Sequence, residues 1–172
     1  MVNFLDLEKL LHHREYYDHE QTSPLTHILN DKIILFRQTA DNRSITITPF
    51  IQENLYLIAD PFAIDRIINN LLDNAIRYTQ NGGTIRVEAK KTDGTIRLSV
   101  QDSGMGMGKE ELAGLFTPFR QLSRDKKNMQ GMGIGLSLVK MILDSLEAHI
   151  TVESRTGKGS LFTMVFPQKR VA

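Results

Sequence analysis

One segment restricts the fold of this chain more than any other: the run from Asp60-Pro61 to Thr79 is predicted to form a single long amphipathic helix. Successive helical residues are turned by about 100°, so its apolar residues gather on one broad face that must pack against another element. These residues are Ile64, Ile67, Ile68, Leu71, Leu72, Ala75 and Ile76. The sequence therefore predicts a central helix packed on a second layer.

Alternating runs after this helix supply the second layer. Thr84–Lys90 and Thr95–Gln101 alternate apolar and polar residues on either side of Thr92-Asp93-Gly94, which is the pattern of a β-hairpin. The further expected elements are a short helix near Lys109–Leu115, a helix over Ile134–Glu147, and strands over His149–Ser154 and Leu161–Phe166. Strands and helices therefore both contribute to one core.

The first part of the chain adds two more strands and a helix. Ser23 and Pro24 are predicted to be the N-cap and first residue of a helix that ends near residue 41. Ser44–Ile51 and Leu55–Ala59 are predicted to pair as a hairpin, with Pro49 placing the first strand at an edge. The predicted fold is α+β, a two-layer sandwich with a mixed sheet of about five strands and helices on one face.

Composition excludes several classes of function. The 172 residues are 41% hydrophobic and carry a net charge of +1, which gives no long-range attraction to nucleic acid. The chain has no cysteine, and its five histidines show no metal-ligand spacing, so a metal would sit mainly on oxygen ligands. No run reaches the roughly 18 apolar residues of a membrane span, and we expect a cytoplasmic chain without direct membrane contact.

The predicted central helix carries a polar stripe away from its apolar face. Asn70 and Asn74 lie about 40° apart, with Arg77 and Tyr78 on either side of them. Two amide oxygens one turn apart suit Mg²⁺, and we expect Asn74 to be the first-choice ligand and Asn70 the second. Arg77 would neutralise phosphate charge and Tyr78 would pack beside a base or ribose. A single asparagine on a helix is more often simply solvated, but four such residues together favour a site.

A second candidate segment follows the predicted hairpin. Asp102 ends a strand and begins a glycine-rich turn, where its carboxylate could accept a hydrogen bond from the amine of an adenine. Gly104 and Gly106 would let the backbone approach a ligand closely. An ordinary Asp-Ser-Gly turn explains this segment equally well when it is considered alone.

A third candidate segment precedes the last predicted helix. Gly131, Gly133 and Gly135, followed by Leu136, would direct free N–H groups and the positive helix end toward phosphates. The pattern is neither a GxxxxGK[ST] loop nor a dinucleotide-fold motif, because the Lys-Ser/Thr pair and the preceding strand are absent. The polar stretch Arg120–Gln130 is predicted to be a mobile lid.

Residues of this predicted lid are further candidates. Arg120 and the other lid cations would contact phosphates, although solvated charges are the more common outcome for each one singly. Phe116 and Phe119 would anchor the start of the lid, or else belong to the core.

With these segments in order, the chain resembles the catalytic ATP-binding domain of bacterial sensor histidine kinases. The similar segments are the N box at Asn70–Tyr78, the glycine boxes at Asp102–Gly106 and Gly131–Gly135, and the F box at Phe116–Phe119. The resemblance spans about Leu25–Pro167 and implies a Bergerat-type sandwich with an ATP lid. It implies ATP and Mg²⁺ as ligands, with Asn74 on the metal and Asp102 on adenine.

The resemblance also implies a domain organisation. Residues 1–22, with an amphipathic helix over Asn3–Tyr17, would be the end of a second dimerisation helix and a linker, and residues 23–172 the catalytic domain. His19 lies in HEQTSP but too close to the ATP-binding segments to be the phosphoacceptor. The acceptor histidine would then lie on a missing dimerisation domain. A response regulator would be a partner, and the parent protein would be either free in the cytoplasm or anchored in the inner membrane.

Three other functions of the same fold have to be compared with a histidine kinase: ATP hydrolysis, serine phosphorylation and non-catalytic nucleotide binding. Hydrolytic relatives, such as gyrase-type topoisomerases and heat-shock chaperones, place a glutamate base where this chain has Asn70, and an amide cannot serve as that base. Transfer to a separate acceptor is therefore favoured over hydrolysis. An anti-sigma-type serine kinase and a non-catalytic nucleotide-binding module are the alternatives to a histidine kinase.

Overall fold

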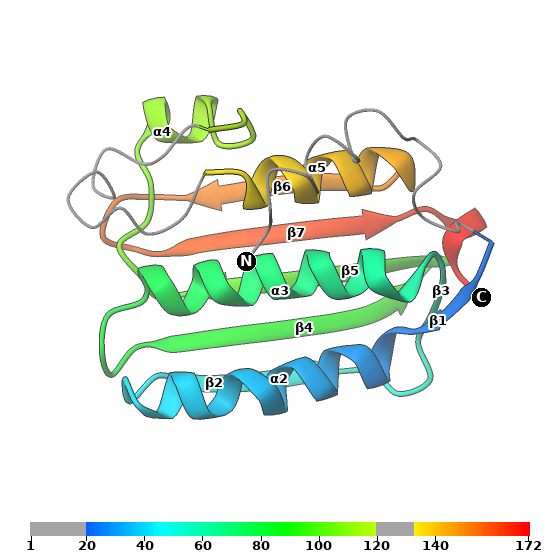
Figure 1. Cartoon of the computed structure of the whole chain (residues 1–172), viewed down its shortest axis with the longest axis horizontal. Helices are drawn as coiled ribbons and strands as arrows, with labels where there is room; N and C mark the ends of the chain where they lie inside the picture. Colours follow the sequence, from blue (N-terminus) through cyan, green and yellow to red (C-terminus); the bar gives the residue numbers. More distant parts are fainter. Residues whose placement is uncertain (1–19, 120–132) are drawn as a thin grey trace.

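The computed structural model describes residues 20–119 and 133–172, in which three long helices cover one face of a sheet (Figure 1). The helices are α2 (Leu25–Asp41), α3 (Pro61–Tyr78), the short α4 (Lys109–Ala113), α5 (Gly135–Ser145) and the 3-10 turn η2 (Gln168–Arg170). The strands are β1 (Thr22–Pro24), β2 (Thr46–Ile51), β3 (Tyr56–Ile58), β4 (Thr84–Thr92), β5 (Thr95–Asp102), β6 (His149–Ser154) and β7 (Ser160–Phe166).

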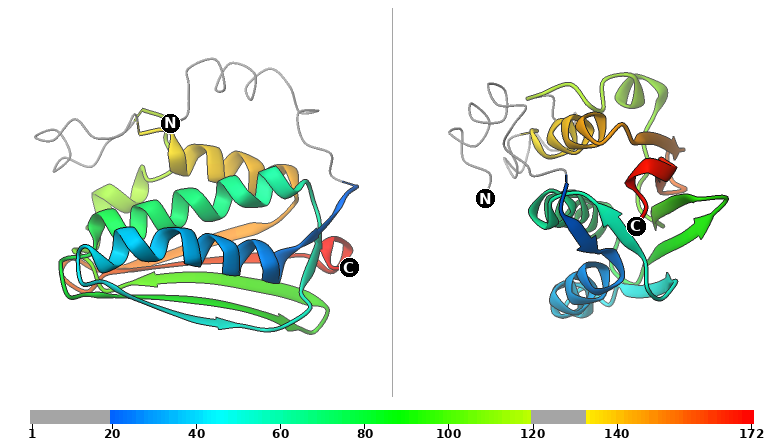
Figure 2. Two further views of the ribbon diagram at one scale, coloured as in Figure 1. Left: turned by 60° about the horizontal axis from the view of Figure 1, so that its bottom comes forward. Right: turned by 90° about the vertical axis from the view of Figure 1, so that its right-hand side faces the viewer.

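The main sheet has five strands in the order β2-β4-β5-β7-β6. β2 runs parallel to β4 and the other neighbours are antiparallel, so the sheet is mixed. Figure 2 shows α2, α3 and α5 together on one side of it. The alternate residues of β4 and β5 that face these helices are buried, as are the apolar residues of α3. The predicted α+β sandwich is confirmed.

The predicted hairpin between residues 44 and 59 is wrong. β2 pairs with β4, whereas β3 pairs with β1 in a separate two-stranded sheet. The cause lies at the start of α2, where the Thr26 hydroxyl donates to Gln52 O at 2.8 Å and accepts from Leu55 N at 3.0 Å. These bonds hold the connecting turn against α2 and keep the two strands apart. Pro49 does lie in an edge strand, as expected.

The predicted N-cap at Ser23 is also wrong. Ser23 lies in β1 and is fully buried, and its hydroxyl donates to Ala59 O at 2.6 Å. α2 begins at Leu25, after Pro24, and no side chain caps it. The local Ser-Pro signal is overridden because the hydroxyl satisfies a backbone carbonyl 36 residues away.

α3 is anchored at both ends. Asp60 caps its start by accepting from Phe62 N at 2.8 Å, with Pro61 in the first turn. At its end, the Arg43 guanidinium donates to Ile76 O and, at 2.7 Å, to Thr79 O. A positive charge at a helix C-terminus is favourable and satisfies carbonyls that the helix leaves open. Arg43 therefore holds the end of the helix that carries the predicted polar stripe.

Replacing Arg43 by methionine is expected to lower the free energy of unfolding by about 2–3 kcal/mol, because charge-assisted hydrogen bonds to two carbonyls are lost. Denaturant unfolding followed by circular dichroism measures this change. Arg37→Met makes the same substitution at an exposed position of α2 and serves as the control. Equal losses for the two variants would contradict a capping role for Arg43.

Several sequence predictions lie outside the described residues. They are the amphipathic helix over Asn3–Tyr17, His19, the lid Arg120–Gln130 and Gly131 of the second glycine box. Among the helices of residues 20–119 and 133–172, none combines the length and apolar character needed to cross a bilayer.

Candidate functional site

The polar stripe of α3 meets the start of α5. Asn70 and Asn74 are both half-buried, and the Asn70 side-chain amide donates to Arg66 O at 2.7 Å. Its other amide atom, Oδ1, points at α5: a Cβ atom added to Gly135 would lie only 2.4 Å from it. Two candidate segments that are far apart in the sequence are therefore brought into contact, with an amide oxygen at the first residue of a helix.

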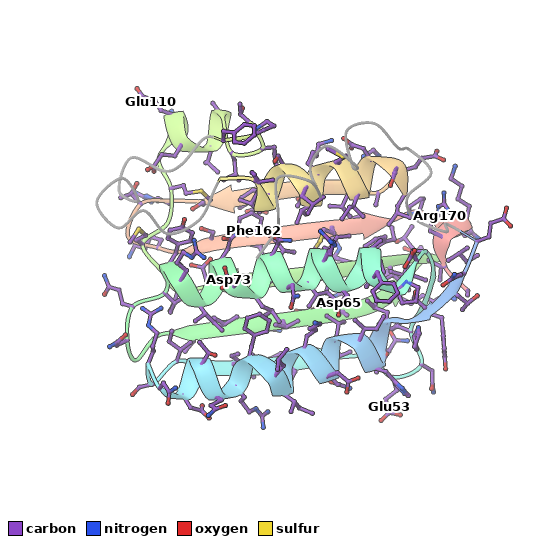
Figure 3. The ribbon with its side chains drawn as sticks, in the orientation of Figure 1. Glu53, Asp65, Asp73, Glu110, Phe162 and Arg170 are labelled. Atoms are coloured by element: carbon purple, nitrogen blue, oxygen red, sulfur yellow. The ribbon has the colours of Figure 1, made fainter. Side chains whose placement is uncertain are left out.

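The C-terminal end of the polar stripe carries Arg77 and Tyr78, which have other contacts. Arg77 Nη2 forms an ion pair with Asp73 Oδ2 at 2.8 Å, one helical turn back. Figure 3 labels Asp73 on α3. Asp73 is exposed, so Arg77 lies at the rim of the site with part of its charge already compensated. Tyr78 is half-buried, and its carbonyl accepts from Met105 N at 3.2 Å. The end of α3 is thus joined to the glycine-rich loop that follows β5.

Asp102 ends β5 with a nearly buried carboxyl group, 7% exposed. Its Oδ1 accepts from Gly104 N at 2.8 Å. Burial raises the pKa of Asp102 above its ordinary value, and hydrogen bonds from Gly104 and from the amide and hydroxyl of Ser160 oppose this rise. The result is a dehydrated acceptor fixed at the end of a rigid strand, which suits recognition of a donor group.

The glycines of this loop have a structural reason that sequence reasoning missed. We define the glycine loop as Asp102–Gly108. A Cβ on Gly104 would lie 2.4 Å from Tyr78 O, and one on Gly106 would lie 2.0 Å from Arg155 O. Gly106 also has a φ of +61°. These glycines are required because the loop is packed against the backbone of α3 and of the turn after β6.

Two serines that were not among the predicted site residues lie beside Asp102. The Ser154 hydroxyl accepts from Met107 N at 2.8 Å and donates to Gly159 O at 2.9 Å, and its oxygen is 3.0 Å from Ser160 Oγ. Ser160 is directly opposite Asp102 in the β5–β7 register. For Ser160, the available signal was its place at the end of the GKGS turn, Gly157–Ser160.

A backbone hydrogen bond joins the predicted F box to the residues just before α5. Phe119 N donates to Gly133 O at 3.0 Å, so the residues on either side of the undescribed segment 120–132 are held together. Gly133 has a φ of +69° and Phe119 a φ of +62°. Phe119 is 58% exposed and Phe116 half-buried, so neither belongs to the buried core. Leu136 is half-buried and packs against that core.

The donor set of the site is made of oxygen atoms. The described residues contain no group of three His, Cys, Asp or Glu side chains arranged for a metal ion. Amide oxygens of Asn70 and Asn74 remain, and a magnesium ion takes few protein ligands when phosphates and water complete its shell. The residues present therefore fit a nucleotide-bound magnesium ion better than a metal held by protein alone.

Comparison with known proteins identifies the family of this chain. The sequence pattern of the histidine kinase-, DNA gyrase B- and HSP90-like ATPases matches residues 59–170. The cell-division control histidine kinase PdhS of Brucella canis is 31% identical over 159 residues, which are 86% of this chain and 15% of PdhS. The adaptive-response sensory kinase SasA of Synechococcus elongatus is 39% identical over 115 residues, covering 66% of this chain and 30% of SasA.

Solved structures give the same result. The catalytic domain of histidine kinase ThkA superposes with a TM-score of 0.75 at 27% identity, covering 86% of this chain and 95% of that one. The mycobacterial sensor histidine kinase MprB is similar in fold, with a TM-score of 0.76 at 22% identity over 86% of this chain and 97% of that one. This chain spans less than a third of the lengths of PdhS and SasA. The chain belongs to the histidine kinase-, DNA gyrase B- and HSP90-like ATPase family.

Proposed function

We propose that this chain is the catalytic ATP-binding domain of a histidine kinase, which donates the γ-phosphate of ATP to a histidine on another domain. The observation that supports it most is the approach of Asn70 to Gly135, which joins an oxygen ligand on α3 to the N-terminus of α5. A helix N-terminus favours phosphate, and the oxygen ligand favours its magnesium ion. Asp102, a buried acceptor, would take the adenine amine.

In this proposal, Asn74 and then Asn70 hold Mg²⁺, which neutralises charge on the phosphates when it is bound. Gly131, Gly133, Gly135 and Leu136 line the phosphate side, and Asp102, Gly104 and Gly106 the base side. Tyr78 and Phe119 would pack against the nucleotide, while Arg77 and Arg120 would supply positive charge. The ion pair with Asp73 already compensates part of the Arg77 charge.

The proposed reaction is transfer and not hydrolysis. An imidazole nitrogen of the acceptor attacks the γ-phosphorus, the bond to the bridging oxygen breaks, and ADP leaves with that electron pair. The phosphorylated imidazolium then loses the proton on its other nitrogen. Asn70 donates its amide to Arg66 O and has no basic group with which to activate water. The similarity to the kinases PdhS and SasA and to the catalytic domain of ThkA supports this assignment over a serine kinase or a non-catalytic module.

The partners follow from the same proposal. Residues 1–22 would be the end of a dimerisation helix and a linker, with the acceptor histidine on a dimerisation domain in the parent protein. A response regulator would receive the phosphate from that histidine, and ThkA has been solved in complex with its response regulator protein TrrA. We place the domain in the cytoplasm, where such partners and ATP are available.

Calorimetric titration with ATP and Mg²⁺ tests the site. Asn74→Ala is expected to weaken ATP binding at least about tenfold with Mg²⁺ present, and much less when the metal is removed with a chelator. Asn69→Ala makes the same substitution on α3 one position before Asn70, outside the proposed stripe, and should bind like the wild type. Unchanged binding by Asn74→Ala would contradict the proposed metal ligand.

A transfer assay tests the reaction itself. The wild-type parent protein, incubated with ATP labelled at the γ-phosphate, is expected to acquire an acid-labile and base-stable label on a histidine. This chain alone should acquire no such label, because we assign the acceptor to another domain. A stable label on serine of a partner would instead favour the serine kinase.

A further inference from the structure

The last turn of α3 is held by groups from outside the helix. Carbonyl groups at the end of a helix have no partner within it. The Arg43 guanidinium donates to Ile76 O and, at 2.7 Å, to Thr79 O. Between these two residues in the sequence, Tyr78 O accepts from Met105 N at 3.2 Å. Arg43 therefore binds the carbonyl groups on either side of the one that holds the glycine loop.

This helix end is packed directly on the part of the glycine loop that orients the proposed adenine acceptor. A Cβ on Gly104 would lie 2.4 Å from Tyr78 O, so the two backbones approach as closely as glycine allows. Gly104 N in turn donates to Asp102 Oδ1 at 2.8 Å. A shift of the Tyr78 carbonyl group would therefore move the amide that fixes the Asp102 carboxyl group.

A second set of contacts leads from Arg43 to the same loop. Arg43 Nε donates to Asn81 Oδ1 at 3.2 Å, and Arg43 O accepts from Gly82 N at 3.1 Å. Just beyond this turn, Thr84 N donates to Ser103 Oγ at 2.9 Å, and Thr84 O accepts from Ser103 N at 3.0 Å. Both sets of contacts thus end in the glycine loop.

The proposed metal ligands are held by other contacts. Asn74 and Asn70 lie about one and two turns before the end of α3. Asn70 Oδ1 points at Gly135 in α5, on the proposed phosphate side. The hydrogen bonds of the Arg43 side chain end at the last turn of α3 and in the turn that follows it. Loss of the guanidinium should therefore loosen the base side of the site more than the phosphate side.

We propose that Arg43 is a positioning residue for base recognition: its guanidinium fixes the end of α3 and, through it, the glycine loop and the Asp102 carboxyl group. This inference rests on the proposed function, because it presumes that Asp102 receives the adenine amine. It adds a role in ligand preference to the capping of α3 by Arg43. If Arg43 only stabilised the fold, its loss would weaken the binding of every nucleotide equally.

Arg43→Met tests this role through a nucleotide preference. Calorimetry on the whole chain with Mg²⁺ measures the dissociation constants of ATP and of purine riboside triphosphate, in which hydrogen replaces the 6-amino group. The ratio of the two constants decides, because both ligands carry the same ribose and phosphates and partial unfolding affects both equally. We expect the wild type to prefer ATP and Arg43→Met to reduce that preference about three- to tenfold, the effect of one hydrogen bond.

Two controls separate positioning from a general loss of stability. Arg37→Met makes the same substitution at an exposed position of α2 and should keep the preference. Ile33→Ala opens a cavity in the core, since Ile33 is buried. Ile33 lies level with the start of α3, because its neighbour Lys32 pairs with Asp65 at 2.8 Å. This variant should lose stability and still keep the preference for ATP.

A double variant tests whether Arg43 acts through Asp102. In an Asp102→Asn background the adenine amine has lost its acceptor, so Arg43→Met should change the preference less than about twofold. If the methionine variant shows no cooperative melt, Arg43→Lys replaces it with the same expected direction of change, because lysine keeps the charge without the forked guanidinium.

An unchanged preference in Arg43→Met, or an equal fall in Ile33→Ala, would overturn the role of Arg43 while leaving the proposed function in place. A fall of the same size in the Asp102→Asn background would overturn its action through Asp102. Wild-type protein that binds neither nucleotide would overturn the proposed function and this inference together. A preference that falls in Arg43→Met and persists in both controls supports the positioning role.

Discussion

Replacing Gly159 by alanine is expected to destabilise the fold by about 2–5 kcal/mol and to weaken ATP binding sharply. Gly159 has a φ of +80°, where a Cβ is unfavourable, and that Cβ would lie 1.9 Å from Asp102 O. The clash is with backbone, so no side-chain rotation relieves it. The turn between β6 and β7 must then move away from the strand end that carries the Asp102 carboxyl group.

Gly157 provides the control for this prediction. Its φ is +76°, close to that of Gly159, but a Cβ there would meet nothing within 4 Å. Gly157→Ala should therefore lower the free energy of unfolding only by the cost of a Cβ at positive φ, about 1–2 kcal/mol. Its affinity for ATP should be unchanged. Denaturant unfolding and calorimetric titration of both variants measure the difference. Similar stabilities for the two would show that the close approach of Gly159 to Asp102 carries no energetic weight.

These glycines also show which features of the structure could be predicted from the sequence. The residues of α3, β4 and β5 were predictable because their periodicities, 3.6 and 2, are local properties of the chain. The need for Gly104, Gly106 and Gly159 was not predictable in the same way. It arises from contacts with Tyr78, Arg155 and Asp102, whose positions depend on the completed sheet.

Local signals failed where distant groups competed for the same atoms. Ser23 has the sequence context of an N-cap, yet its hydroxyl is used by Ala59 O in the small sheet. The runs around β2 and β3 have the spacing of a hairpin, yet Thr26 binds the turn between them. Among the predicted site residues, Asn70 and Gly135 lie close together although 65 positions separate them in the sequence. Ser154 and Ser160 escaped notice since single serines carry no periodic pattern.

Replacing Asp102 by asparagine is expected to stabilise the ligand-free chain while weakening ATP binding about tenfold to a hundredfold. Asparagine can keep the hydrogen bond from Gly104 N through its oxygen, and it removes a charge from a site that is 7% exposed. Its NH₂ group, however, would face the adenine amine as a second donor. Stability and affinity therefore change in opposite directions, which general damage to the fold does not produce.

The pH dependence of the unfolding free energy gives a second test of the Asp102→Asn prediction. Burial raises the pKa of Asp102 above its ordinary value of 3.8, so the folded chain holds that proton more tightly than the unfolded chain. The wild type then loses stability as pH rises from about 3.8 through the raised pKa of the folded state, and Asp102→Asn lacks that loss. The advantage of the variant in unfolding free energy should grow over this window and then stay constant.

Asp93→Asn makes the same change of charge at an exposed turn residue and isolates the effect of burial. Its φ of +50° lies in the left-handed region, which asparagine tolerates as well as aspartate does. We expect no change in ATP affinity for this control. If Asp102→Asn bound ATP as tightly as the wild type, the carboxylate would not be the group that receives the adenine amine. A variant of Asp102 with lower stability at neutral pH would instead mean that the hydrogen bonds from Gly104 and Ser160 outweigh the cost of burying the charge.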